Sequence, residues 1–303
     1  TAAAPSIAVM PFANLSPDPD NEYFADGMTE EVINTLGQIK ALRVAARTSS
    51  FAFKGRTPEL SEVGEKLRVA TVLTGSVRKA GGRLRISVAL VNVSDGFQIW
   101  SERYDRQDED VFSVQDEIAK TIAEQLKVAL VAPNAPLVQR ATDNLDAYQL
   151  YLKARFYMNQ RGTGLAQGMA LLRQAIALAP DYAPAHAALA DAYALIGFYG
   201  YAPCYEVMPK ARQSAQHALA LNPALAEAHA PLVFVSWTHD WDFARARREF
   251  DAAMALDPRM VTALIWWSLG LSSALGEFTQ AIKIGERAIE VDPLSAASCM
   301  AMN

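Results

Sequence analysis

The first part of the chain alternates short apolar runs with amphipathic helical patterns. Residues 6–12 are mostly apolar and bounded by prolines, which is typical of a buried strand. Residues 26–39 repeat apolar side chains at helical spacing, and Asp26 is placed to cap this helix. Residues 42–46 predict a second strand, and a second helix is expected to begin at Thr57, just before a proline.

Residues 70–107 change to a two-residue period. Strands are predicted at 71–79, 84–93 and 97–104, separated by short glycine-containing turns that favour an antiparallel meander. A third helix is expected at 109–131, where apolar residues recur at steps of four. The order β-α-β-α-β-β-β-α predicts an α/β domain over residues 5–131, with helices packed on one mixed sheet.

The second half of the chain repeats itself. Four similar elements contain Pro180, Pro223, Pro258 and Pro293, which are spaced by 43, 35 and 35 residues. Each proline follows a helical pattern of small and apolar residues, and proline ends a helix. The spacing resembles the period of about 34 residues of tetratricopeptide (TPR) helix pairs. We expect an all-α TPR solenoid over residues 144–303.

This solenoid is expected to contain about four helix pairs, the last of them truncated, with roughly eight extra residues near 197–209. Residues 295–303 begin another first helix, so the natural protein is expected to carry more repeats. Residues 132–143 are rich in proline and lose all periodicity. They predict a linker between two separately folded domains.

Composition narrows the possible partners. The chain has 303 residues, of which 51% are hydrophobic and 20% charged, and its net charge is −5. Residues 1–131 hold 15 basic and 18 acidic side chains, so a phosphate-tracking nucleic-acid surface is not expected. No apolar run reaches the ~18–20 residues that cross a membrane. The chain reads as a fragment; a membrane helix upstream of Thr1 would make it periplasmic, and without one it would be cytoplasmic.

Catalytic and metal-binding motifs are not found. The sequence lacks a P-loop, a dinucleotide fingerprint, a His-Glu-x-x-His and a Gly-x-Ser-x-Gly pattern, so we expect no catalytic residues, no cofactor and no metal. Asp18, Asp20 and Glu22 alternate like the start of a calcium loop but lack its later residues, which favours a solvated turn. His186 and His229 occupy matching repeat positions, where packing explains them without a ligand.

Two other groups of side chains have structural explanations. Cys204 and Cys299 are too few for a disulfide framework and are expected to be small buried residues. Arg78, Lys79, Arg83 and Arg85 flank the first hairpin turn. A salt-bridged surface involving Glu62, Glu65 and Asp95 is favoured there over an anion-binding site.

Five blocks in the first domain occur in a recognisable order. They include Glu22-Tyr-Phe-Ala-Asp-Gly-Met-Thr-Glu-Glu and Arg47-Thr-Ser-Ser-Phe-Ala-Phe-Lys-Gly, and they span residues 6–15, 22–31, 47–55, 73–79 and 100–106. These blocks resemble those of the TolB-like N-terminal domain found ahead of TPR repeats in bacterial signalling proteins. The resemblance implies an interaction or sensing module, which in that family often follows a winged-helix, adenylate cyclase or protein kinase domain, commonly with a membrane helix between.

The function expected from these features is a non-enzymatic sensing and protein-interaction region of a larger bacterial signal-transduction protein. The alternatives are a cell-envelope assembly or scaffold factor and, third, an enzyme that uses the loops of the first domain. A peptide or protein is expected to bind the concave TPR groove. The resemblance places Asp191, Phe234, Trp237 and Leu269 at first-helix positions that face this groove, and Glu227 is expected to take part in binding beside them. Phe234 and Trp237 are predicted to form an apolar patch beside Asp191 and Glu227. The lysine and asparagine clamp of chaperone-binding TPR domains is not matched.

Overall fold

The computed structural model describes residues 4–128, 137 and 141–300. These residues divide into two compact units, an α/β unit in the N-terminal part and an all-helical unit that begins at Ala141. Each unit is described by itself below. The α/β domain followed by TPR-like helix pairs confirms the fold class predicted from the sequence. No helix within the described ranges is long and apolar enough to cross a membrane.

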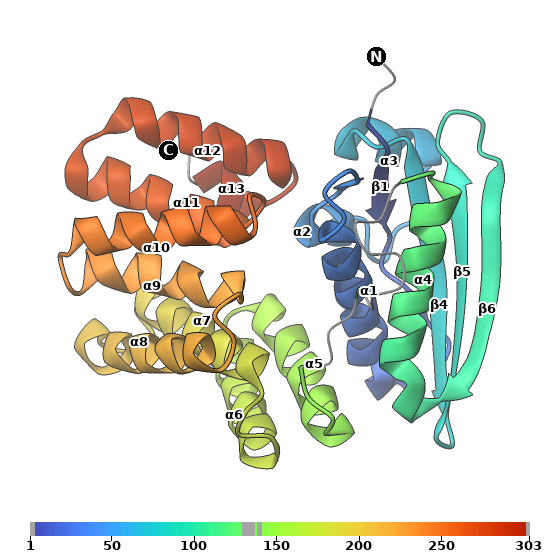
Figure 1. Cartoon of the computed structure of the whole chain (residues 1–303), viewed down its shortest axis with the longest axis horizontal. Helices are drawn as coiled ribbons and strands as arrows, with labels where there is room; N and C mark the ends of the chain where they lie inside the picture. The colour runs from blue at the N-terminus through green and yellow to red at the C-terminus, as the bar shows by residue number, and fades with distance from the viewer. Residues whose placement is uncertain (1–3, 129–136, 138–140, 301–303) are drawn as a thin grey trace. The chain divides into compact units, whose positions relative to one another are not determined.

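One mixed sheet organises the N-terminal unit (Figure 1). Its strands are β1 (Ser6–Val9), β2 (Ala13–Asn14), β3 (Arg43–Val44), β4 (Thr71–Ala80), β5 (Arg83–Asn92) and β6 (Gln98–Gln107). The order is β3-β1-β4-β5-β6, with β2 paired to the second half of β4. β1 runs parallel to β3 and β4, whereas β4, β5 and β6 form the predicted antiparallel meander.

Four α-helices accompany this sheet: α1 (Glu22–Gly37), α2 (Arg47–Phe51), α3 (Leu60–Leu67) and α4 (Val111–Gln125), with 3₁₀ turns η1 (Pro19–Asn21) and η2 (Asp108–Asp110). The expected cap at Asp26 is wrong, because α1 begins at Glu22 and Asp26 lies buried inside it. The turn before the helix is capped instead by Asp18, whose carboxylate accepts the N–H of Asp20.

Other boundaries differ from the sequence prediction for local reasons. α2 was not expected, because its five residues are too few to show a helical period. The second expected helix begins at Leu60 rather than at Thr57. The last helix ends at Gln125 instead of 131, and residues 129–131 lie outside those described.

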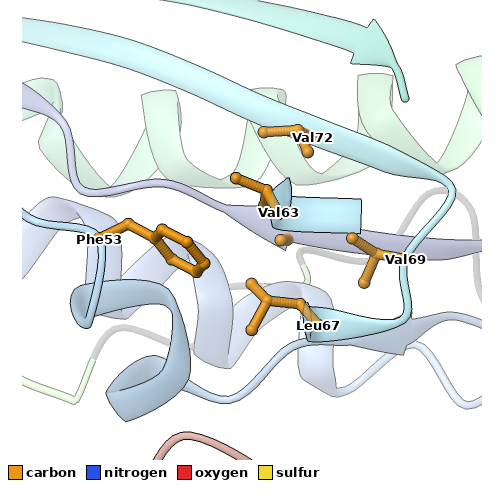
Figure 2. Packing of buried hydrophobic residues seen from close by; sticks show 6 residues of the cluster. Phe53, Val63, Leu67, Val69 and Val72 are labelled. Carbon is orange, nitrogen blue, oxygen red and sulfur yellow. The ribbon is translucent and has the colours of Figure 1, made fainter. Parts of the chain in front are cut away.

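Two apolar layers hold the N-terminal unit together. On one face of the sheet, Val63 and Leu67 of α3 pack against Ala8 of β1 and Val72 of β4. Phe53 and Val69, which lie just outside α3, complete this cluster (Figure 2). On the opposite face, alternate residues of β5 are buried. The β5 residues between them lie on the same face as α3 and are exposed or half-buried, with Arg83 and Arg85 exposed. The antiparallel part of the sheet therefore keeps one face open to solvent, as antiparallel sheets commonly do.

The helical unit consists of successive antiparallel pairs (Figure 1). Its helices are α5 (Leu145–Gln160), α6 (Thr163–Leu178), α7 (Ala183–Phe198), α8 (Cys204–Leu221), α9 (Ala226–Thr238), α10 (Phe243–Leu256), α11 (Val261–Gly270), α12 (Phe278–Val291) and α13 (Ala296–Met300). A π-helical turn, η3 (Leu271–Leu275), continues α11.

Small residues let these helices approach closely. Ala187, Ala218 and Ala228 meet between α7, α8 and α9. The first helices α7, α9 and α11 also pack on one another in a row, which we call the first-helix face. This arrangement is the packing that a TPR array requires.

The repeated prolines act as predicted. The residues before three of them, Ala179, Asn222 and Asp257, have φ near −140° (−141°, −141° and −137°) and therefore leave the helix. The extra residues near 197–209 do not form a long loop. They are shared between the end of α7, a short connection and the start of α8. α8 has 18 residues and holds Pro209 in its interior.

The linker predicted at residues 132–143 falls mainly on residues 132–136 and 138–140, which lie outside the described part of the chain. We expect limited proteolysis to cut first between about residues 131 and 143, because prolines there oppose regular structure and few contacts are expected to protect the backbone. Mass spectrometry of the fragments checks this. A first cut within residues 70–107 would contradict the proposed boundary.

Candidate partner-binding site

Aromatic rings from three successive first helices meet on the first-helix face. Phe198 at the end of α7 lies 5.9 Å from Phe234 of α9 and 5.0 Å from Trp266 of α11, measured between ring centroids. Phe234 and Trp266 are themselves 4.3 Å apart. Contacts at these distances are favourable beyond the burial of apolar area. The three helices are thus joined through their rings.

The ring contacts continue outward along the loop after α7. Tyr199 lies 5.2 Å from Phe198, and Tyr201 lies 5.7 Å from Tyr199. Phe198, Tyr199 and Tyr201 are all exposed to solvent, whereas Phe234 and Trp266 beneath them are each 3% exposed. We call Phe198, Tyr199, Tyr201, Phe234, Trp237 and Trp266 the aromatic cluster. It has a rigid buried base and an exposed rim.

Trp237 connects this cluster to a cavity. Its ring lies 5.6 Å from Phe234 and rests on the backbone of Gly270, where a Cβ would come within 3.1 Å of the indole. The cavity has a volume of about 460 Å³ and is lined by Trp237, Thr238, Trp241, Ser273 and Ala274. A side chain at position 270 would therefore press on the indole, and Trp237 would have to shift by a few tenths of an ångström to accommodate it.

Two local backbone features shape the cavity. Trp241 has a left-handed backbone, with φ of 55°, and its side chain is 71% exposed. Ser273 and Ala274 belong to the π-helical turn η3, where the Ser273 hydroxyl donates to the Leu269 carbonyl. π-Turns inside helices occur often at functional sites. A cavity of this kind can accept an apolar side chain of a partner.

The structure brings together only some of the predicted site residues. Phe234 and Trp237 are in ring contact, and Leu269 directly precedes the Gly270 on which Trp237 rests. Phe234 is buried under Phe198 and Trp266, so it supports the surface instead of forming it. Glu227 lies exposed in the first turn of α9. Their binding role stays a prediction.

Asp191 of α7 has a different environment. Burial raises the pKa of its carboxyl, while the guanidinium groups of Arg161 and Arg155, from the preceding helix pair, act in the opposite direction. Its carboxylate makes no hydrogen bond or ion pair with other described residues. Asp191 is therefore a half-buried carboxyl group on α7, one of the first helices.

Three ionic contacts in the N-terminal unit were not predicted from the sequence. Lys54 Nζ lies 2.6 Å from Asp26 Oδ1 and 2.8 Å from Glu22 Oε1, and Arg47 Nε lies 2.7 Å from Glu30 Oε2. All three contacts join the block at 22–31 to the block at 47–55. The spacing of four between Asp26 and Glu30 continues the apolar stripe of α1 and could have indicated that both carboxylates are buried.

The matched histidines do not share one environment. His186 Nε2 is 2.9 Å from the Pro180 carbonyl and its ring packs on His217, and burial lowers the pKa of His186. His229 Nδ1 instead contacts the Glu249 carboxylate at 2.8 Å. Within the described ranges, no three histidine, cysteine or carboxylate side chains are grouped so that they could hold a metal ion.

The two cysteines correct the sequence prediction of burial. Cys204 and Cys299 are not joined in a disulfide, and both are exposed. Cys204 begins α8, where its thiol lies 3.8 Å from the Gly197 carbonyl. A helix start leaves this side chain at the surface even though cysteine is apolar enough to be buried.

These features define the class as an α/β domain joined to TPR-like helix pairs. Residues 2–121 match the family model described as the second domain of HilA/YgeH-like transcriptional regulators. The chain is also 42% identical over 189 residues to a protein named "Putative adenylate cyclase 3" from Rhizobium meliloti (strain 1021). That match covers 62% of this chain and 32% of the relative, so the chain spans about a third of that protein.

Similar solved structures belong to both groups that the sequence resembles. TolB from Acinetobacter baumannii is 15% identical with a TM-score of 0.31, and the match covers 41% of this chain and 28% of that one. TTC0263, a TPR protein of Thermus thermophilus, is 18% identical with a TM-score of 0.44. Its match covers 64% of this chain and 93% of that one.

Proposed function

We propose that this chain is a non-enzymatic sensing and protein-interaction region of a larger bacterial signalling protein. In this proposal the first-helix face of the TPR-like unit captures a peptide or protein segment. The observation that carries the proposal is the exposed aromatic rim beside the cavity between Trp237 and Trp241. Large exposed apolar patches mark interaction sites, and tryptophan and tyrosine are enriched among residues that anchor a partner.

The arrangement of the rim supports peptide capture. The buried rings of Phe234 and Trp266 hold the base of the cluster, so little side-chain entropy remains to be lost when a partner binds. Trp237 and Trp241 form walls of the cavity, which is large enough for an aromatic or branched side chain. Asp191 adds a carboxylate that can accept hydrogen bonds from a partner's backbone or basic side chain.

The relatives support the signalling context. The matched family is described as part of transcriptional regulators, and the matched relative is named as an adenylate cyclase. Because that relative is about three times as long as the matched region, we propose that this chain corresponds to its non-catalytic interaction part. The partner then controls an effector region that is separate from the residues described here.

Replacing Trp241 by alanine tests the proposed site. Peptides are first selected from a displayed library against the wild-type chain, and their affinities are measured by fluorescence anisotropy. We expect Trp241→Ala to weaken binding by about tenfold, because the variant loses an exposed anchor ring. Its free energy of unfolding should change by less than ~0.5 kcal/mol, since the side chain is mostly in water.

Tyr205→Ala is the matched control. Tyr205 is also 71% exposed, but it lies on the second helix α8 and outside the aromatic cluster. Its replacement should change affinity by no more than about twofold. Equal losses in both variants would show that the selected peptides bind elsewhere. Failure to select any peptide that depends on Trp241 would contradict the proposed site.

A further inference from the structure

The open face of the β4-β5-β6 meander carries four arginines and one aspartate. Arg78 of β4 lies opposite Arg85 of β5, and Arg85 lies opposite Asp105 of β6. Side chains two residues apart on a strand share a face, so Arg83 and Arg103 lie on this face as well. We call these five residues the arginine face. The other face of the meander is the buried one that carries Leu84, Ile86 and Tyr104.

The carboxylate of Asp105 interacts with more than one of these guanidinium groups. Asp105 Oδ1 accepts from Arg85 Nε at 2.7 Å, and Arg103 Nε lies 3.5 Å from Asp105 Oδ2. The hydrogen bond from Arg85 lowers the pKa of Asp105, and the positive charges of Arg85, Arg103 and Arg83 lower it further. All three arginines therefore lie within electrostatic reach of one anion.

The remaining positive charge is not neutralised by the acidic residues expected from the sequence. Glu62 pairs instead with Arg56 and Lys66, and Lys79 pairs with Asp108. Arg78 and Arg83 are exposed and form no ion pair with any residue that the structure describes. The arginine face thus keeps an excess of three positive charges, in a chain whose net charge is −5.

This concentration of positive charge destabilises the domain when no partner covers it. Like charges placed directly opposite on neighbouring strands, as Arg78 and Arg85 are, destabilise a sheet. Exposed faces without a partner usually mix both signs of charge. Arginine is also the side chain that binds carboxylates through two parallel hydrogen bonds. The pattern suits an anionic partner that covers the face.

We propose that the arginine face binds an acidic segment of a partner protein in extended conformation. Arg83 and Arg85 are two residues apart on one strand, about 7 Å, which equals the spacing of carboxylates at alternate positions of an extended peptide. The five residues of the arginine face lie on three strands, β4, β5 and β6, which span about 10 Å. Residues 1–131 carry 18 acidic against 15 basic side chains, so a long nucleic acid would be repelled beyond this face.

This site is separate from the proposed aromatic site and does not depend on it. A fluorescein-labelled peptide of five Glu-Ser repeats is the probe, and five Gln-Ser repeats give the neutral comparison. Fluorescence anisotropy with the full chain at low salt should show binding of the Glu peptide only. The double variant Arg78→Gln, Arg83→Gln should weaken binding about fivefold, because two exposed ionic contacts are lost.

The matched control removes two other exposed positive charges from the same unit. Lys40→Gln with Arg43→Gln changes the net charge equally at the β3 edge and should leave affinity within about twofold. Equal losses in both double variants would overturn the proposal, as would equal binding of the Gln peptide or no binding of the Glu peptide. A 20-base-pair duplex that displaces the Glu peptide at lower concentration would assign the face to nucleic acid and also overturn it.

Discussion

Replacing Lys54 by alanine is expected to lower the unfolding free energy of the N-terminal domain by about 3 kcal/mol. Lys54 Nζ lies 2.6 Å and 2.7 Å from the two carboxylate oxygens of Asp26, which is 5% exposed. Removing the lysine leaves this carboxylate buried without its nearest cation. A buried charge that loses its partner keeps the cost of leaving water and loses the compensating attraction.

Hydrogen exchange followed by mass spectrometry measures this effect in the N-terminal domain separately from the helical repeats. Peptides covering α1 and β4 should exchange faster in the variant, whereas peptides from α9 should not change. Lys66→Ala is the control, since Lys66 forms an exposed pair with Glu62 and should cost less than ~1 kcal/mol. Equal costs for Lys54→Ala and Lys66→Ala would show that burial of Asp26 does not matter.

The loss of unfolding free energy caused by Lys54→Ala should depend on pH. Burial is the main cause that raises the pKa of Asp26, and Lys54 opposes it, so removing Lys54 should raise this pKa further. A carboxyl whose folded pKa lies above its unfolded value favours folding most below the unfolded pKa, and this advantage is lost as pH rises through the folded pKa. The difference in unfolding free energy between the wild-type chain and Lys54→Ala should therefore become smaller when the pH is lowered from 7 toward 5.

Asp26 also shows why part of the N-terminal domain could not be predicted from the sequence. Aspartate is a favoured helix cap, and a charged residue is seldom buried without a partner, so the cap was the natural expectation. The partner Lys54 is 28 residues away, and local periodicity does not report such contacts. The strands of the meander were predictable because alternation and glycine turns are local signals.

In the helical repeats too, features set by neighbouring residues could be predicted from the sequence, whereas features set by distant contacts could not. The stops at Pro180, Pro223 and Pro258 could be predicted, because proline acts on its own segment of backbone. The side of α9 that contributes to the proposed binding surface could not be predicted. Residues 230–236 of that helix are all buried, so no apolar stripe distinguishes one side from another.

Phe234 is where that ambiguity matters most. The sequence pattern predicts that Phe234 lies in a surface patch, but its ring is 3% exposed and contacts the rings of Phe198, Trp237 and Trp266. We expect Phe234→Ala to lower the unfolding free energy of the helical unit by about 3–4 kcal/mol, because it opens a cavity among three helices that cannot all move inward. Replacing an exposed ring by alanine would lower the unfolding free energy much less.

Chemical denaturation followed by tryptophan fluorescence measures this loss, since Trp237, Trp241, Trp266 and Trp267 all lie in the helical unit. Phe234→Leu should recover part of the stability, because leucine refills some of the cavity with apolar volume. Trp241→Ala gives the surface comparison within the same unit. If Phe234→Ala were as mild as Trp241→Ala, the ring would not be part of the rigid base. The aromatic rim would then lack the fixed support on which its role as a binding surface depends.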